Sequence, residues 1–269
     1  MNPSRIRNGL NTIYWWLEKR IDAQTKSSQY LYSETLRSHL GVGRRWLDVG
    51  CGRQVLPDWI PDQASLVSAA KLAVGLDYTE ESIDGNRQLS CLIVGDVENM
   101  PFAATSFDIV SANMLVEHLA KPLETLREIY RILSPGGHFI YHTSNFQFYM
   151  IFVASLVPQK VKNKIIKVAE GRSAEDVFPT QYRMNTLKAI APMAEDSGFQ
   201  VVECHCVNSS STSDMIFGPF VILTLFIRRL LRWDRLRQFR SNFIVVLEKP
   251  FSEGGRTPVV WQGDSEDVD

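Results

Sequence analysis

Apolar stretches and polar turns alternate along this 269-residue chain in a regular order. Short runs rich in Val, Ile, Leu and Phe are typical of buried strands, whereas apolar positions three and four residues apart are typical of helices packed on a sheet. We expect strands at residues 45–49, 71–77, 90–96, 107–113, 138–142, 199–207 and 241–249, and helices at residues 6–23, 29–40, 80–88, 122–133 and 186–197. Strands that alternate with helices indicate parallel βαβ units.

The first strand leads directly into a glycine turn, in the stretch Arg45-Trp46-Leu47-Asp48-Val49-Gly50-Cys51-Gly52. Two glycines permit a sharp turn and leave room for a ligand close to the backbone. The carboxylate of Asp48 stands near the end of the strand, where open α/β sheets bind ligands. Val55 occupies the place of the third glycine in a dinucleotide-binding motif, which disfavours a nicotinamide enzyme. An ordinary turn without a ligand is the alternative.

Two later strands also end in an acid, Asp77 and Asp96. An acid one βα unit after the glycine turn can accept both hydroxyl protons of an adenosine ribose, and Tyr78 beside it could lie against the base. The alternative for Asp77 is to cap the N-terminus of the helix at residues 80–88, and the two roles are compatible.

Taken together, these pieces resemble the motifs of the class I S-adenosylmethionine (SAM)-dependent methyltransferases, of the type 11-like group. The similar segments are Leu47-Asp48-Val49-Gly50-Cys51-Gly52, Gly95-Asp96 with Pro101-Phe102, Phe107-Asp108, Glu117-His118, and Leu133 with Pro135-Gly136-Gly137. They follow one another in the family's order between residues 45 and 145, somewhat over a third of the chain.

The resemblance implies a Rossmann-like α/β fold with a seven-stranded, mostly parallel sheet, helices on both faces and an antiparallel last strand. It also implies helical insertions after strands five and six. We therefore expect one methyltransferase domain over residues 1–250, with a SAM-binding core at residues 29–145. Residues 146–185 and 208–240 would be insertions that face the acceptor or a membrane, and residues 251–269 a flexible tail.

The cofactor implied by the resemblance is SAM. The residues expected to bind it are Asp48, Gly50, Cys51, Gly52, Asp77, Tyr78, Asp96, Val97, Asn113, Met114 and His118. Methyl transfer from a sulfonium depends largely on holding the reactants in line, but a hydroxyl acceptor must also lose a proton. His118 and His142 are the candidate catalytic bases. The alternatives are that His118 shapes the cofactor pocket and that His142 is a satisfied group in its wall.

Net charge indicates which partners are disfavoured, and cysteine content indicates the redox setting. The net charge of −1 gives no overall basic field for nucleic acid, and the four cysteines form no spaced framework, so we expect a reducing, cytoplasmic setting. In a strand, Cys204 and Cys206 share one face while His205 points away, so we expect no metal site.

Two apolar insertions favour a small-molecule, lipid-like or lipid-linked glycan acceptor, methylated on oxygen. The second insertion carries an apolar run at residues 215–227, too short for a bilayer span of about 20 residues. Arginines follow it, which suits a helix lying in the membrane interface or, equally, a buried helix with a solvated basic end. Residues 215–240 are thus a candidate peripheral contact with the inner face of a membrane. The alternative function is a non-catalytic SAM-binding module that acts as a membrane-recruited partner protein. The sequence does not indicate an oligomeric state.

Overall fold

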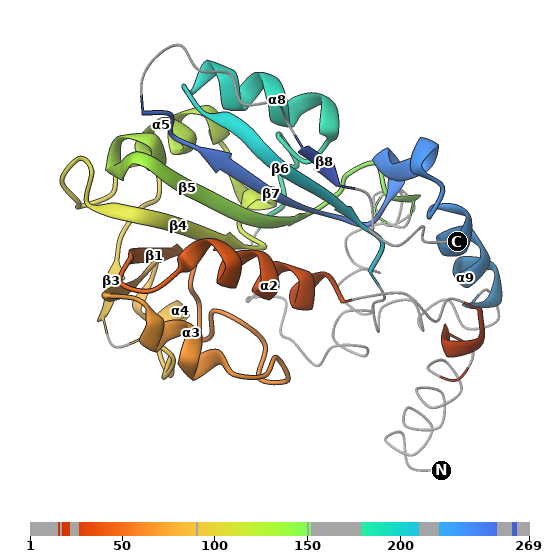
Figure 1. The fold of residues 1–269 in the computed structure, drawn as a ribbon, viewed down its shortest axis with the longest axis horizontal. Coiled ribbons are helices and arrows are strands. Elements are labelled where there is room, and N and C mark those ends of the chain that lie inside the picture. Colours follow the sequence, from red (N-terminus) through yellow and green to blue (C-terminus); the bar gives the residue numbers. More distant parts are fainter. Residues whose placement is uncertain are drawn as a thin grey trace.

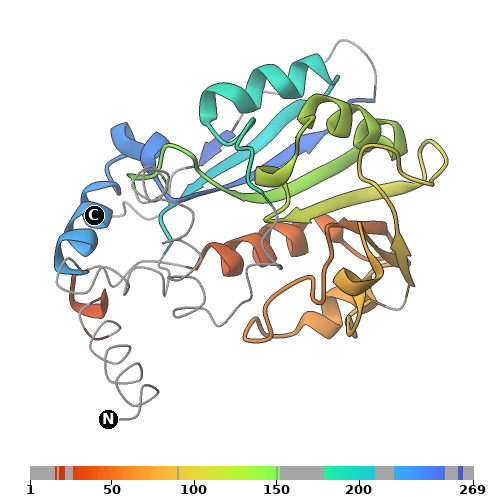
Figure 2. The same cartoon turned by 180° about the vertical axis from the view of Figure 1, so that it is seen from behind.

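The structure is a computed structural model that describes residues 16, 18–21, 27–89, 91–149, 151, 179–209, 221–251 and 260–262. An eight-stranded β-sheet organises these residues, with strand order β3-β2-β1-β4-β5-β7-β6-β8. Helices α2 and α3 lie on one side of the sheet and α5 and α8 on the other (Figures 1 and 2). The fold is therefore the Rossmann-like α/β fold expected from the sequence.

The sheet is parallel except for one strand. Its members are β1 (Arg45–Val49), β2 (Leu72–Asp77), β3 (Cys91–Val94), β4 (Phe107–Asn113), β5 (Leu133–Ser144), β6 (Gln200–Val207), β7 (Asn242–Glu248) and β8 (Val260–Gln262). Strand β7 runs antiparallel to both of its neighbours, β5 and β6. Strand β8 was not expected. It lies in the segment predicted to be a tail, and it pairs in parallel with β6 as an eighth strand.

The described helices match most of the expected ones. They are α2 (Ser28–Leu40), α3 (Gln63–Ala69), α4 (Glu80–Ile83), α5 (Pro122–Ile132), α8 (Leu187–Asp196) and α9 (Val221–Leu230), with 3-10 helices η1 (Val116–His118) and η4 (Asp234–Phe239). Helix α3 was not predicted, and α4 is shorter than predicted because the chain turns at Gly85, whose φ is +82°. Of the predicted helix at residues 6–23, only residues 16 and 18–21 are described, and they are helical.

The two predicted insertions are described to different extents. After β6, helices α9 and η4 confirm that residues 208–240 contain helical structure. After β5, most of residues 146–185 lie outside the described residues, so that prediction is not tested there. Within the described ranges, no helix has the length and apolar character needed to cross a membrane.

Each face of the sheet has its own hydrophobic core. Val110, Phe139 and Tyr141 belong to the cluster that also contains residues of α5 and α8. Their strand neighbours Ile109 and Ile140 belong to the other cluster, beneath α2. Since successive residues of a strand point to opposite faces, a strand covered on both sides is apolar throughout.

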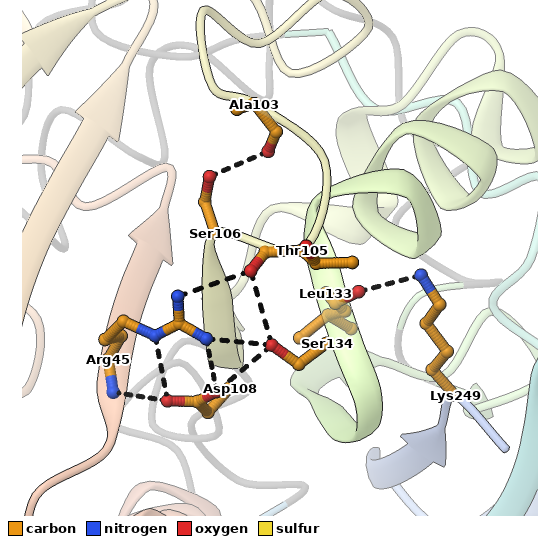
Figure 3. Close-up of polar contacts among 8 residues, drawn as sticks. All are labelled: Arg45, Ala103, Thr105, Ser106, Asp108, Leu133, Ser134 and Lys249. Carbon is orange, nitrogen blue, oxygen red and sulfur yellow. Dashed lines mark hydrogen bonds and ion pairs between the residues drawn. The ribbon is translucent and has the colours of Figure 1, made fainter. Parts of the chain in front are cut away.

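A polar cluster ties the amino-terminal ends of β1, β4 and β5 together (Figure 3). The Arg45 guanidinium donates to both carboxylate oxygens of Asp108, at 3.1 and 2.7 Å, and Ser134 Oγ donates to the same carboxylate at 3.1 Å. These contacts with Arg45 lower the pKa of Asp108 to about 2. Lys249, just after β7, donates to the Leu133 carbonyl at 2.7 Å. The cluster fixes strand register at the edge opposite the predicted site.

Candidate functional site

The carboxyl ends of the parallel strands bring the predicted binding residues to one edge of the sheet. Strand β1 lies between β2 and β4, so the chain crosses over to opposite sides of it. A crevice forms at such a crossover point in open α/β sheets. Gly50, Gly52, Asp77, Asp96 and Asn113 all follow or end strands at this edge.

The glycine turn after β1 folds back onto the end of β2. Gly50 and Gly52 have positive φ angles of 68° and 47°. The Gly50 and Cys51 N–H groups donate to the Leu76 carbonyl, at 2.8 and 3.2 Å. A Cβ at Gly52 would meet no atom within 4 Å, whereas one at Gly50 would lie 3.0 Å from Leu115. The backbone at Gly52 is thus open to a ligand, and the backbone at Gly50 is packed.

The Asp77 carboxylate holds this turn in place by hydrogen bonds. Its Oδ2 accepts a hydrogen bond from the Gly52 N–H at 2.8 Å, and its Oδ1 accepts one from the Tyr78 N–H at 2.7 Å. The alternative role as a helix cap is wrong, because Thr79 caps α4 by accepting from the Ser82 N–H. A carboxylate oxygen has two acceptor positions, so each oxygen of Asp77 retains one for a ligand hydroxyl. Tyr78 beside it is 65% exposed.

The side chain of Cys51 lies away from the crevice. It is buried, and a Cβ at Gly75 in β2 would lie only 2.7 Å from its Sγ. Burial raises the pKa of the thiol. A contact of Cys51 with a cofactor, as predicted, would therefore involve its backbone, because its side chain packs against Gly75 of β2.

Asp48 is also buried, 1% exposed, on the α2 face of the sheet. Ser111 Oγ donates to the Asp48 carboxylate, and Trp46 Nε1 donates to Ser111 Oγ at 2.8 Å. Burial raises the pKa of Asp48 to about 7. This position suits a supporting group behind the crevice rather than a charged contact on its surface.

A second hydrogen-bond network determines which ring nitrogen of His142 carries the proton. Asn113 Nδ2 donates to the Val55 carbonyl at 3.1 Å, which orients the amide because a carbonyl can only accept. Asn113 Oδ1 therefore faces His142 Nδ1 at 2.9 Å. We assign the proton of His142 to Nδ1, which leaves Nε2 as the basic nitrogen. Gln29 from α2 closes the network on Asn113 at 2.9 Å.

His142 is completely enclosed by this arrangement. Its ring stacks on Tyr32 at 5.7 Å between centroids, and desolvation lowers its pKa to about 3. Nε2 is buried with no hydrogen-bond partner in the described part of the chain. His142 is thus neutral at physiological pH and does not reach solvent.

The other predicted residues line the same edge. Met114 adopts a positive φ of 58°, rare for a residue with a side chain, and its N–H donates to the His142 carbonyl at 2.8 Å. Asp96 is exposed and its Oδ1 accepts from the Glu98 N–H at 2.9 Å. Val97 is half-buried against the core. These positions leave Asp96 and Met114 next to the crevice.

His118 and its neighbour Glu117 attach a later segment to the site. His118 is half-buried on η1, with Nδ1 3.2 Å from the Pro179 carbonyl. The buried Glu117 accepts from Thr143 Oγ1 at 2.7 Å, and its carbonyl accepts from the Gln181 N–H at 2.7 Å. Burial raises the pKa of Glu117. Sequence reasoning missed Glu117 as a site residue, although its place beside His118 was the available signal.

The arrangement has features of a nucleoside-binding site. Throughout the described ranges, no three His, Cys, Asp or Glu side chains are grouped to hold a metal ion. An open glycine turn, a carboxylate with spare acceptor positions and an apolar wall suit a ligand such as an adenosyl group.

Comparison with known proteins identifies a related domain. Residues 47–141 match the family model described as a methyltransferase domain. The chain is 32% identical over 140 residues to a demethylmenaquinone methyltransferase of Staphylococcus epidermidis, covering 48% of this chain and 57% of that protein. It is 32% identical over 120 residues to a malonyl-[acyl-carrier protein] O-methyltransferase of Erwinia billingiae, covering 43% of this chain and 45% of that protein.

The fold is shared with solved structures. A crystal structure of a methyltransferase-like protein from Bacillus halodurans superposes with a TM-score of 0.51 at 18% identity, covering 81% of this chain and 98% of that one. The sequence relatives are matched over about half of their own length. The residues that match the family model, 47–141, contain the glycine turn and the strand-end acids described above.

Proposed function

We propose that this chain, whose residues 47–141 match a methyltransferase domain, is a class I SAM-dependent methyltransferase that transfers a methyl group from SAM to a small, lipid-like or lipid-linked acceptor. The observation that carries the proposal is the pairing of Asp77 with the glycine turn. The carboxylate holds Gly52 in place and keeps acceptor positions for two hydroxyl groups.

The residues present fit a bound SAM. Asp77 would hold the ribose hydroxyls, and Asp96 with Val97 would meet the adenine. The open backbone at Gly52 leaves space for the ligand, while Asn113 and Met114 would border its methionine end. Bound SAM supplies an electrophilic methyl group on a sulfonium. The chain's own contribution is to orient the two reactants and to exclude water, which accounts for much of the rate in such a displacement.

For a hydroxyl acceptor, we assign the proton-accepting role to His118 rather than His142. His142 is enclosed, and its pKa of about 3 makes it a weak base. His118 is half-buried on η1 and is oriented through Nδ1 by the Pro179 carbonyl. His142 instead holds Asn113 in position at the cofactor side.

The acceptor class rests on the relatives and on apolar surface. Two relatives act, by their names, on demethylmenaquinone and on a malonyl group carried by an acyl-carrier protein. Both acceptors are small organic groups. The exposed apolar residues of α9, described below, favour the lipid-like end of this range. Transfer to oxygen is proposed by analogy with the relative named as an O-methyltransferase.

Asp77→Ala tests the cofactor site. We expect it to weaken SAM binding by about 100-fold or more, because hydrogen bonds to a charged group are the strong ones and two are lost. Calorimetric titration of SAM into the folded protein gives the affinity. Asp84→Ala is the matched control, since Asp84 is an exposed acid seven residues further along the chain, and it should bind SAM as wild type does.

Wild-type protein that is folded but gives no heat with SAM would refute the proposal. If SAM binds but no labelled methyl group appears on any component of a lipid, quinone or glycan extract, the non-catalytic binding module is the better description.

His118→Asn tests the base. We expect kcat to fall by about 100-fold with little change in SAM affinity, because general-base contributions are of this size. The loss should appear in kcat, because the asparagine cannot accept the proton. An unchanged kcat in His118→Asn would assign the proton transfer elsewhere.

A further inference from the structure

Helix α9 presents its apolar side to solvent. Ile222, Leu223, Phe226 and Leu230 lie at spacings of one, four and eight residues, which is one face of a helix. These side chains are between 46% and 57% exposed. Trp233, in the turn that follows α9, is 66% exposed. We call these five residues the α9 face.

The opposite side of α9 is buried although it carries a charge. Thr224, Leu225 and Arg228 face inward, and Arg228 is completely buried. Arg228 pairs with Glu18 at 3.2 Å, and its carbonyl accepts from Asn208 Nδ2 at 2.6 Å. Folding ordinarily buries Leu and Phe and exposes Arg. A helix rotated by half a turn would do so, and α9 is held in the reverse orientation by specific polar contacts.

Exposed basic and aromatic side chains also occur on α9 and in the segment that follows it. Arg229 and Arg235 are exposed, and Phe239 of η4 is partly exposed. Arg229 also donates to the Ile21 carbonyl at 2.8 Å, which joins the short helical segment of residues 18–21 to α9. That segment carries exposed Lys19 and Arg20. Figures 1 and 2 both show it next to α9, at the end of the molecule away from α3 and α4.

The combination of apolar, aromatic and basic groups indicates what kind of partner would bind the α9 face. Monomeric proteins seldom leave a contiguous apolar surface of this kind without a partner. A helix of ten residues is about 15 Å long, half the thickness of the hydrocarbon layer, so α9 cannot span it. A short helix with an apolar face, an aromatic residue and flanking arginines is suited to lie in the plane of an anionic lipid interface.

We propose that the α9 face docks this protein on the surface of an anionic lipid bilayer, with Phe226 and Trp233 inserted among the acyl chains and Arg229 and Arg235 at the headgroup phosphates. This proposal goes beyond methyl transfer and does not depend on it, because membrane binding is measured without SAM. It is independent of the crevice at Asp77, whose residues belong to other elements.

Vesicle flotation of the full-length protein tests the proposal. We expect wild type to float with phosphatidylcholine vesicles that contain about one third phosphatidylglycerol, and to float less with phosphatidylcholine alone. The double variant Phe226→Ser/Trp233→Ser should lower the bound fraction by about tenfold or more, since two large apolar side chains no longer insert. Trp59→Ser is the matched control, because Trp59 is an exposed tryptophan outside the α9 face, and it should float as wild type does.

The charged residues have a separate test. Arg229→Gln/Arg235→Gln should remove the preference for phosphatidylglycerol and reduce binding to those vesicles by about tenfold. Raised salt should weaken wild type in the same direction. All variants are compared with wild type for thermal unfolding and SAM affinity. Leu230→Ser and Phe226→Ser alone provide milder changes on the same face.

Three outcomes would overturn the proposal. Wild type could remain with the unbound protein for both vesicle types, or the Phe226→Ser/Trp233→Ser variant could float as well as wild type. Sedimentation could instead show a wild-type dimer that the same variant dissociates, without flotation, in which case the α9 face joins two copies of the chain. Normal SAM binding in these variants would separate any such result from a failure of the proposed methyl transfer.

Discussion

At the scale of single residues, two ionisable groups under α2 respond to pH in opposite ways. Burial raises the pKa of Asp48 from 3.8 to about 7 and lowers that of His142 from 6.5 to about 3. Both side chains are thus held neutral in the folded protein over much of the acidic range. The unfolded chain releases the Asp48 proton near pH 4 and binds a proton on His142 near pH 6.5.

Asp48→Asn should reveal the contribution of this carboxyl group. Between about pH 4 and 7 the folded state keeps a proton that the unfolded state has released, so Asp48 lowers the stability of the wild type progressively as pH rises. The stability of Asp48→Asn relative to wild type should increase over this window by up to about 4 kcal/mol, and then stay constant. The amide can still accept from Ser111. Urea unfolding at several pH values measures the difference.

The comparison between variant and wild type is necessary because His142 has the opposite effect. Its contribution to wild-type stability grows as pH rises from about 3 to 6.5, so the two slopes partly cancel in the wild-type curve. A stability difference between Asp48→Asn and wild type that does not vary with pH would mean that Asp48 is ionised in the folded protein.

At the scale of elements, the two ends of the strands have different tasks. The amino ends of β1, β4 and β5 are joined by Arg45, Asp108 and Ser134 (Figure 3). The carboxyl ends carry the glycine turn and Asp77. Because the strands are parallel, one edge of the sheet can be fixed for register while the other remains open to a ligand.

Asp108→Asn should destabilise the fold by about 1–2 kcal/mol, a modest amount because the Arg45 pair is partly exposed to solvent. The pKa of Asp108 is lowered to about 2, so its contribution is present above about pH 4 and is lost as pH falls toward 2. Chemical unfolding at neutral pH measures the loss, with Asp84→Asn as an exposed control. A larger loss at pH 3 than at pH 7 would contradict this account.

At the scale of the whole molecule, the amino and carboxyl ends of the parallel strands lie at opposite edges of the sheet. Variants at the two edges should therefore differ in how SAM stabilises them. SAM at about 100 times its dissociation constant should add about 2.7 kcal/mol of stability, which raises the melting temperature of a chain of this size by about 5–10 °C. Asp108→Asn should retain this shift, because its cluster lies at the far edge, and Asp77→Ala should lose it. Loss of the shift in Asp108→Asn with retention in Asp77→Ala would reverse the assignment of the two edges.

The α9 face belongs to the same scale, since α9 is attached to the end of β6, where Asn208 Nδ2 donates to the Arg228 carbonyl at 2.6 Å. Its buried Arg228–Glu18 pair joins segments 210 positions apart in the sequence. The orientation of α9 therefore depends on contacts across the fold and not on the local pattern. Sequence periodicity indicated an apolar helix followed by arginines, and left open which side of it would face solvent.

The sequence by itself determined the order of strands and helices, the glycine turn and the acids at the strand ends. These are local properties: apolar runs, φ angles that only glycine adopts easily, and spacing within a βα unit. Strand ends and helix limits agree with the structure to within a few residues for most elements, as for β4 at Phe107–Asn113. The short α4 and the strand β8 are exceptions, because a turn and a distant pairing partner decided them. Strand β5 also begins five residues earlier than predicted, at Leu133, which pairs with Phe107 of β4.

Only the tertiary structure decided what each of these side chains does. Cys51 and Asp48 belong to the sequence motif, yet the packing of Gly75 and Ser111 draws both side chains into the interior. His142 and His118 look equivalent in the sequence, and burial together with the orientation of Asn113 separates them. Burial, proton position and the face that a helix exposes are set by neighbours far along the chain, which a local pattern does not contain.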